Sequence, residues 1–157
     1  MLGREVFDPG KRQVSGYAAM VIRTRPAVEP DKPFLSWLEE ACMREYAVAL
    51  WGAWRPRPRD EQSLDGCRII VEGEEGIGCV TTIVRPDHVW IDQLYVSPRF
   101  QRKGIGSTAL RMVLSEAAAM GVPVKLSVIV TNPVLDFYLR HGLRIHEETP
   151  ERRFMTT

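Results

Sequence analysis

Residues 101–106 read Gln-Arg-Lys-Gly-Ile-Gly and lie between a strand-like run and a helix-like run. They constrain the fold most, because a strand that leads into a glycine-rich turn at the start of a helix makes an anion site. The first N–H groups of a helix have no internal partner, and the aligned peptide dipoles place about +0.5 charge there. Gly104 and Gly106 allow the backbone to approach phosphate oxygens, while Arg102 and Lys103 add cations. The loop therefore predicts a phosphate-bearing ligand.

Three other interpretations of this loop compete. A P-loop is excluded because the Gly-Lys-Ser/Thr ending is missing. Residues 104–109 match the dinucleotide pattern G-x-G-x-x-A, but seven residues separate the strand end at Val96 from Gly104, where that fold needs a tight turn. The next strand also ends in Thr131-Asn132, without the acid that would hold a ribose. A structural loop with a basic surface remains open, since a lone glycine pattern is weak evidence.

Composition narrows the class of protein. The 157 residues, of which 45% are hydrophobic and 26% charged, suit one globular domain with a buried core. The net charge of +1 gives no reason to expect a nucleic-acid partner. No run approaches the roughly 20 apolar residues of a membrane span, so we expect no membrane partner. The spacing of Cys42, Cys67 and Cys79 favours neither disulfides nor a metal site, which predicts a cytoplasmic protein without a metal.

Hydrophobic periodicity predicts an α/β sandwich with a mixed sheet. The expected strands are 20–24, 67–72, 77–85, 89–96 and 124–130, followed by a closing hairpin at 143–146 and 152–155. The expected helices are 32–51, 107–120 and 133–140. Asp31 is placed to cap the first helix, and Gly52 to end it.

Residues 1–18 show no periodicity, so we predict a flexible leader followed by a single domain at 19–157 whose first strand opens near Met20. Deletion of residues 1–18 is therefore expected to leave folding and activity intact, because the leader contributes nothing to the core. Thermal denaturation and activity of the full and shortened chains measure this. A large loss of melting temperature in the shortened chain would contradict the prediction.

Two segments together resemble the GCN5-related N-acetyltransferase (GNAT) superfamily. Residues 94–106 and the helix after them are similar to the family's acetyl-CoA motif, a strand followed by Gln/Arg-x-x-Gly-x-Gly/Ala and a helix. Asn132, Tyr138, Gly142 and Leu143 are similar to the family's Asn-x(5)-Tyr-x(3)-Gly-Phe segment, with Leu143 where Phe is commoner. The resemblance covers residues 89–145 closely, and the order of elements before them fits as well.

The resemblance implies a GNAT-like α/β fold, with a mixed, mostly antiparallel sheet of about six or seven strands flanked by about four helices. The strands at 89–96 and 124–130 would run parallel and splay apart. It also implies an acetyl-CoA-dependent N-acetyltransferase that moves an acetyl group to a primary amine directly, in a ternary complex. The acceptor, a small molecule or a peptide amine, stays open, and a homodimer is one alternative for the oligomeric state. A non-catalytic CoA-binding module is the alternative function, because residues 126–128 lack the acid that some members carry there.

The resemblance also assigns residues to the cofactor. Pantetheine would pair with main-chain atoms of Leu94, Tyr95 and Val96, and Asn132 would hold its amide region. Tyr138 would lie near the sulfur. The pyrophosphate would lie on seven consecutive residues: Gln101, Arg102, Lys103, Gly104, Ile105, Gly106 and Ser107.

Tyr138 is the candidate general acid, since a phenol with a pKa of about 10 can protonate a departing thiolate. The alternative is that Tyr138 only packs the core. Asp92 is the candidate base, because simple alternation puts it in phase with apolar residues of its strand (Trp90, Leu94 and Val96). An ordinary salt bridge of Asp92 with Lys125 or Arg68 is the competing interpretation. Glu72 and a water chain are further alternatives for the base.

The segment after the first helix is the candidate acceptor side. Trp51 and Trp54 could offer aromatic faces, and Arg55 and Arg57 could bind a carboxylate. The alternative is a tryptophan-anchored loop with solvated arginines.

Overall fold

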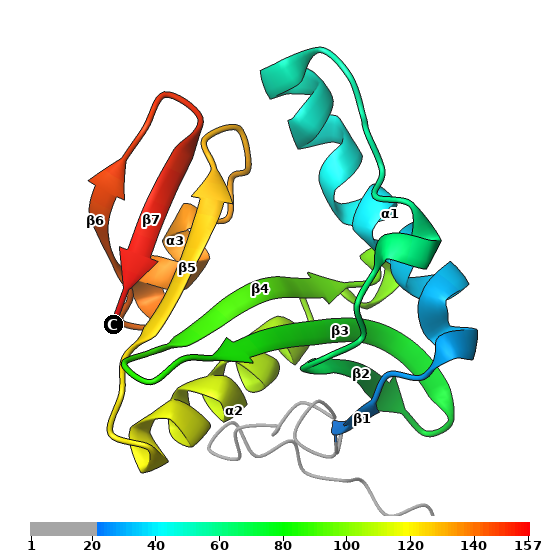
Figure 1. The fold of residues 1–157 in the computed structure, drawn as a ribbon, viewed down its shortest axis with the longest axis horizontal. Coiled ribbons are helices and arrows are strands. Elements are labelled where there is room, and N and C mark those ends of the chain that lie inside the picture. Colours follow the sequence, from blue (N-terminus) through cyan, green and yellow to red (C-terminus); the bar gives the residue numbers. More distant parts are fainter. Residues whose placement is uncertain (1–21) are drawn as a thin grey trace, which may run out of the picture.

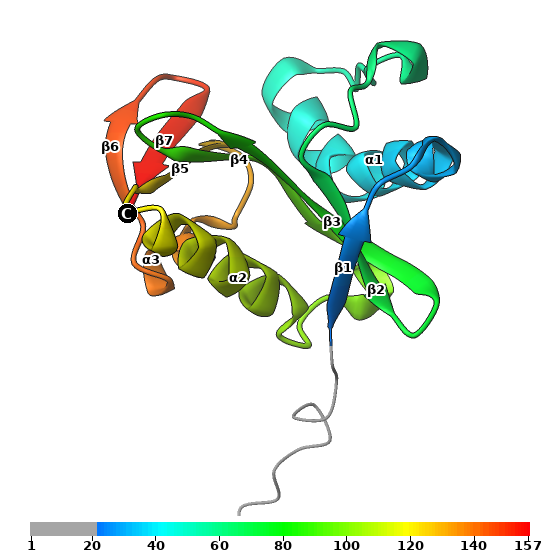
Figure 2. The same ribbon diagram turned by 60° about the horizontal axis from the view of Figure 1, so that its bottom comes forward.

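The computed structural model describes residues 22–157, which form one seven-stranded sheet with helices on both of its faces (Figures 1 and 2). The strands are β1 (Arg23–Pro26), β2 (Cys67–Glu72), β3 (Glu75–Val84), β4 (Val89–Val96), β5 (Val124–Ile129), β6 (Arg144–Glu148) and β7 (Arg152–Thr156). The helices are α1 (Lys32–Trp51), α2 (Ile105–Ala119) and α3 (Leu135–Arg140), with 3₁₀ turns at η2 (Glu29–Asp31), η3 (Arg59–Glu61) and η4 (Pro98–Phe100). The predicted mixed sheet is confirmed, and the helix number is three rather than about four.

The strand order is β1-β2-β3-β4-β5-β7-β6, and every neighbouring pair is antiparallel except β4 and β5. These two pair only at Val89 with Val124 and at Trp90 with Lys125. Beyond that point they diverge, so α1 and the β5–β7–β6 part stand on opposite sides of a V above β4 (Figure 1). The predicted splay of two parallel strands is therefore confirmed.

Several element boundaries differ from the prediction by one or more residues, among them those of β1 and α3. The first strand was expected at 20–24; Met20 and the leader lie outside the described residues, and β1 extends to Pro26. Proline is tolerated there because β1 is an edge strand, where a missing N–H costs no ladder hydrogen bond. α3 starts at Leu135 rather than at Pro133, because residues 130–134 turn and Asn132 N donates to Ile129 O (3.0 Å).

A β-bulge in β4 changes which side chains share a face. Thr81 pairs with Gln93 and Thr82 with Ile91, which leaves Asp92 as the extra residue. Ile91 and Leu94 consequently both pack toward α2, so the expectation that Asp92 is in phase with Trp90, Leu94 and Val96 is wrong. Asp92 is exposed rather than set in an apolar face.

The predicted ion pair of Asp92 with Arg68 or Lys125 is also not formed. Arg68 pairs with Glu116 of α2 at 2.7 Å, and Asp92 has no ion pair within residues 22–157. Asp92 therefore keeps a free carboxylate at the bulge.

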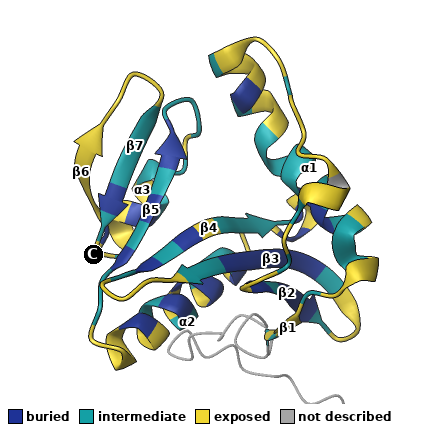
Figure 3. Cartoon of the chain, in the orientation of Figure 1, coloured by how far each residue is buried: buried dark blue, intermediate teal, exposed yellow. Residues whose placement is uncertain are grey.

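Two apolar layers hold the sheet in place. On one face, Leu110 and Val113 of α2 pack with β4, β5 and Met155 of β7, all fully buried or nearly so. On the other face, Leu35 and Leu38 of α1 cover β2 and β3. Figure 3 shows this burial along β2, β3 and the inner side of α2, and shows β6 exposed along its length. Rigid packing on both faces fixes the positions of the splayed strands.

Candidate active site

A cleft of about 1250 Å³ occupies the space where β4 and β5 diverge. β4 forms its floor from Trp90 to Val96, and its walls come from α1, β5, α3 and β7. At one end lies the glycine-rich loop before α2, and at the other lie the end of α1 and the segment after it. Two sites with different chemistry are thus joined in one cavity.

The loop end of the cleft presents free backbone donors. Gly104 has φ +80°, which turns the chain so that α2 starts at Ile105. The first helical bond runs from Thr108 N to Gly104 O (3.0 Å), so the N–H groups of residues 105–107 have no partner within the helix. Helix α2 therefore begins two residues earlier than predicted, and Ile105 and Gly106 belong to its first turn.

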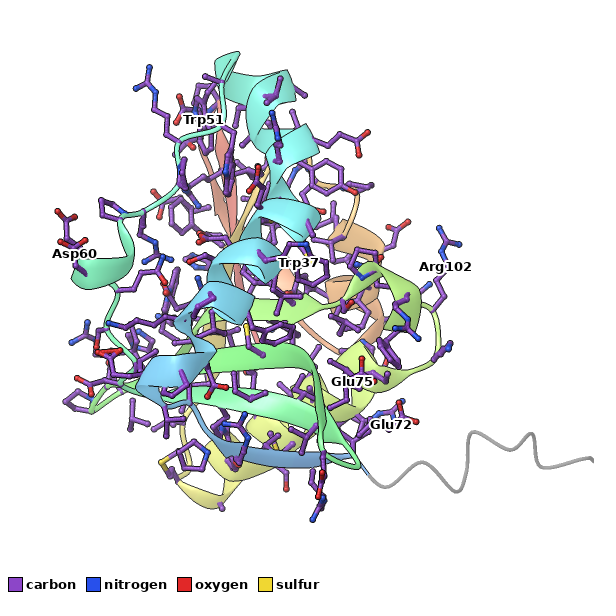
Figure 4. All side chains as sticks on the ribbon, turned by 90° about the vertical axis from the view of Figure 1, so that its right-hand side faces the viewer. Trp37, Trp51, Asp60, Glu72, Glu75 and Arg102 are labelled. Carbon is purple, nitrogen blue, oxygen red and sulfur yellow. The ribbon has the colours of Figure 1, made fainter. Side chains whose placement is uncertain are left out.

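The polar side chains of the loop, Gln101, Arg102 and Lys103, point in three different directions. Gln101 Nε2 donates to Val96 O (2.9 Å) and so ties the loop to the end of β4. Arg102, at φ +61°, borders the cleft and extends outward from the loop (Figure 4). Lys103 Nζ instead lies 5.4 Å from the centre of the Phe100 ring and is not in the cleft wall. Ile105 is 1% exposed, so only its main chain is available to a ligand.

The floor of the cleft exposes main-chain groups of β4. Ser97 N donates to Ile77 O of β3 (2.8 Å). Because main-chain groups alternate in direction along a strand, the N–H and C=O of Tyr95 also point toward β3. The main-chain N–H and C=O groups of Leu94 and Val96 point the other way, into the gap that opens where β5 diverges from β4. Val96 O is occupied by Gln101 and by the Cys42 thiol (3.3 Å), which leaves the N–H groups of Leu94 and Val96 and the carbonyl of Leu94. The main-chain groups of two of the three residues predicted to contact pantetheine, Leu94 and Val96, therefore face the cleft. Tyr95 lines the cleft with its side chain instead.

Tyr138 and Asn132 both lie in the wall between β5 and α3. Tyr138 is 7% exposed, and its burial raises the pKa of the phenol to about 12, so it stays protonated at neutral pH. Its ring also packs in the core on the α2 side of the sheet. Tyr138 therefore both packs the core, as the alternative interpretation expected, and lines the cleft. Asn132 Nδ2 lies 3.8 Å from Met43 Sδ, and Thr131 donates to Tyr46 O (2.7 Å), so α1 bridges the cleft here.

Glu39 is a cleft residue that the sequence did not indicate. Its carboxylate, 16% exposed, lies 3.5 Å from Arg57 in the segment after α1. Burial raises the pKa of the Tyr95 phenol, and the negative charge of the nearby Glu39 raises it further. Glu39 therefore lies close to the Tyr95 side chain. The available signal was the spacing of Glu39 at i+4 from Leu35, because an acid next to the apolar stripe of a helix needs a partner.

The predicted acceptor end is brought together by the fold. Side chains from three separate parts of the chain meet in this wall: Trp51, Trp54, Arg55, Arg57, Asp92, Arg152 and Phe154. Figure 4 shows Trp51 at the far end of α1 from Trp37, and places Glu72 near the β2–β3 turn. Glu72 is not in the cleft wall, so it is out of reach as a base.

One of the three cysteines, Cys42, lines the cleft. Burial raises the pKa of its thiol to about 11, so it is protonated at neutral pH. Cys67 and Cys79 are buried in the layer under α1 and do not line the cleft.

A sequence model of the Acetyltransferase (GNAT) family matches residues 29–143. The chain belongs to this GNAT family. The match includes both segments that carried the resemblance in the sequence, the loop at 101–106 and residues 132–143, so the resemblance is confirmed. No curated protein matches the chain in a sequence comparison.

Solved structures of GNAT proteins share the fold. PaiA N-acetyltransferase of Thermoplasma acidophilum, in complex with coenzyme A, superimposes with a TM-score of 0.70 at 16% identity, covering 88% of this chain and 99% of that chain. An acetyltransferase of Thermus thermophilus gives 0.70 at 20% identity, over 87% and 96%. The ribosomal-protein-S18-alanine N-acetyltransferase of Escherichia coli gives 0.67 at 16% identity, over 87% and 92%. At these identities the likeness shows the fold alone.

Two further properties concern the described residues. Within residues 22–157, none of the helices of this GNAT protein combines the length and apolar character needed to cross a membrane. Over the same range, no three His, Cys, Asp or Glu side chains form a group that could hold a metal ion.

Proposed function

We propose that this GNAT protein is an acetyl-CoA-dependent N-acetyltransferase that transfers the acetyl group directly to a primary amine. The observation that carries the proposal is the single cleft that joins the loop before α2 to an acceptor end lined by Trp51, Trp54 and Arg152. A two-ended cavity allows both substrates to be present at once, as a ternary complex requires. The coenzyme A complex of the Thermoplasma PaiA structure supports the choice of donor.

The free N–H groups of residues 105–107 would bind the pyrophosphate, because an anion at a helix N-terminus satisfies unpaired donors and the helix dipole together. Pantetheine would add to the open side of β4 as an extra strand, through Leu94 and Val96. Asn132 faces the same space from the opposite wall. The residues at 101–107 and on β4 would thus fix the donor along the cleft.

The reaction forms a bond from the amine nitrogen to the acetyl carbon and breaks the carbon–sulfur bond. The amine loses one proton, and the thiolate takes one up. An N–H of β4 would stabilise the oxyanion of the tetrahedral intermediate, and Tyr138 would donate the proton to the sulfur. A pKa of about 12 keeps this phenol a donor through the physiological range.

The base remains open between two carboxylates of the cleft, Asp92 and Glu39. Asp92 is exposed and free of an ion pair within residues 22–157, whereas Glu39 is held by Arg57. A water chain from either carboxylate to the amine is compatible with both positions. Direct transfer is favoured over an acyl-cysteine intermediate because Cys42 is protonated.

We also propose that this activity belongs to a single domain at residues 19–157. The spacing of the cysteines favours no disulfide, which supports a cytoplasmic location.

Binding of acetyl-CoA is expected to stabilise the protein. At 100-fold excess over Kd a ligand adds about 2.7 kcal/mol, which raises the melting temperature of a domain this size by roughly 5–10 °C. Thermal shift and calorimetry with acetyl-CoA measure this, and release of free thiol with a panel of amines measures turnover. No response to acetyl-CoA would reject the proposal. Binding without thiol release for any amine would favour the non-catalytic CoA-binding module instead.

A further inference from the structure

Arg152 enters the acceptor end of the cleft without an acidic partner. It stands at the start of β7, opposite Ile129 of β5, and is half-buried. Its Nη1 donates to Ser127 Oγ (3.2 Å), and its guanidinium carbon lies 6.0 Å from the centre of the Trp51 ring. None of the carboxylates in residues 22–157 lies within ion-pair distance of it. A guanidinium has five N–H donors, and in the part of the chain that the structure describes Ser127 is the one side chain that accepts from Arg152.

Within residues 22–157, Arg152 is the one arginine of the cleft that is half-buried and has no ion pair, because Arg55, Arg102 and Arg140 are exposed. Arg57 borders the same cleft, but the Glu39 carboxylate lies 3.5 Å from it. Arg152 has its aromatic neighbour and its serine hydroxyl on the cleft side, and its unused donors remain available there. These donors can therefore be matched by an anionic group of a ligand.

A second unused donor lies in the same wall. The indole Nε1 of Trp54 is buried and has no hydrogen-bond partner in the part of the chain that the structure describes. Buried polar groups are nearly always paired, so an unpaired donor at a binding cleft indicates a missing acceptor atom.

We propose that the acceptor amine carries a carboxylate and that Arg152 binds it, with Trp51 holding the guanidinium in place. This inference rests on the proposed function, since it names the acceptor of that same reaction. A planar guanidinium fork matches the two oxygens of a carboxylate. Asp92 of β4 lines the same cleft, and its negative charge disfavours a doubly charged phosphate there. The free carboxylate of Asp92 suits the positively charged amine of such an acceptor, which makes the substrate a zwitterion.

Paired acceptors test this directly. Each free amino acid is assayed beside its carboxamide, and peptides with an N-terminal Asp or Glu beside the same peptides with Asn or Gln. We expect one set to show a KM about 10- to 100-fold lower for the carboxylate form, with kcat little changed. Preference within the amino-acid set identifies a free α-carboxylate, and preference within the peptide set identifies a side-chain carboxylate.

Arg152→Gln is expected to remove this preference by raising KM for the carboxylate form to that of the amide. Arg152→Lys should restore part of it, because the charge returns without the fork. Arg153→Gln is the matched control: it is the next residue of β7, its side chain pairs with Glu148 at 3.3 Å, and it is not in the cleft wall. Arg153→Gln should keep the wild-type preference.

The outcomes separate this inference from the proposed function. Thiol release with equal KM values for the carboxylate and amide forms would overturn the inference and leave the acetyltransferase intact. An unchanged preference in Arg152→Gln, or a preference for O-phosphoethanolamine over every carboxylate, would overturn it as well. Absence of both acetyl-CoA binding and thiol release would reject the proposed function, and the acceptor assignment would fall with it.

Discussion

Replacement of Gly104 with valine is expected to abolish the thermal response to acetyl-CoA, weakening its binding by about 100-fold or more. Gly104 caps α2 at φ +80°, a conformation that a β-branched residue adopts only with strain of about 1–3 kcal/mol. The strain is relieved if the turn moves, and the N–H groups of residues 105–107 then lose their alignment on the phosphate. Loss of two charge-assisted hydrogen bonds, at roughly 1.5–3 kcal/mol each, accounts for that factor.

The fold itself should survive this substitution. A Cβ at Gly104 would meet no atom within 4 Å, so no core side chain has to move. Gly73→Val is the matched control, because Gly73 also has a positive φ (+60°) and open space around it, but lies in the β2–β3 turn outside the cleft. Calorimetry of both variants with acetyl-CoA makes the comparison. Full affinity in Gly104→Val would show that the pyrophosphate does not bind at this helix start.

Replacement of Tyr138 with phenylalanine is expected to lower kcat by about 10²- to 10⁴-fold, the usual contribution of a general acid. The ring packs in the core between α2 and β5, and phenylalanine keeps that packing, so stability and acetyl-CoA affinity should change little. Removal of the hydroxyl alone then isolates the proton donor. Single-turnover release of thiol measures the chemical step.

The pH dependence gives a second readout for Tyr138. Because burial raises the pKa of this phenol to about 12, the acid is lost only as the pH rises through that value. The wild-type rate should therefore rise with pH as the amine loses its proton, with no falling limb from Tyr138 below about pH 11. Tyr46→Phe is the control, since Tyr46 also lines the cleft but contributes its carbonyl to Thr131. A Tyr138→Phe enzyme with the wild-type rate would exclude Tyr138 as the acid.

Much of the fold follows from local patterns in the sequence. The bounds of β2 and β4 and the end of α1 at Gly52 were predicted correctly, because apolar periodicity and a left-handed glycine are local signals. The splay of β4 from β5 came from the family resemblance, and the pairing of the two strands confirms it.

The errors arose where distant parts of the chain determine the geometry. Asp92 was assigned to an apolar face by simple alternation, but its pairing partner β3 forces a bulge at that residue. A bulge depends on the register of two strands, so the sequence of one strand does not reveal it. The predicted contact of Lys103 with the phosphate stays a prediction, and the position of its ammonium over Phe100 is a tertiary contact that the sequence did not indicate.

The order of amino acids alone predicted the donor end of the site. The prediction used two short segments of the sequence, and each is recognisable without the fold. One contains Gly104 and Gly106, and the other contains Asn132, Tyr138 and Gly142. The proposed acceptor end needed the folded chain, because Trp51, Asp92 and Arg152 lie on three elements far apart in sequence. Only the packing of α1 and β7 against the splayed sheet brings them to one cavity, and only the folded chain shows that Arg57 is paired with Glu39 while Arg152 contacts Ser127.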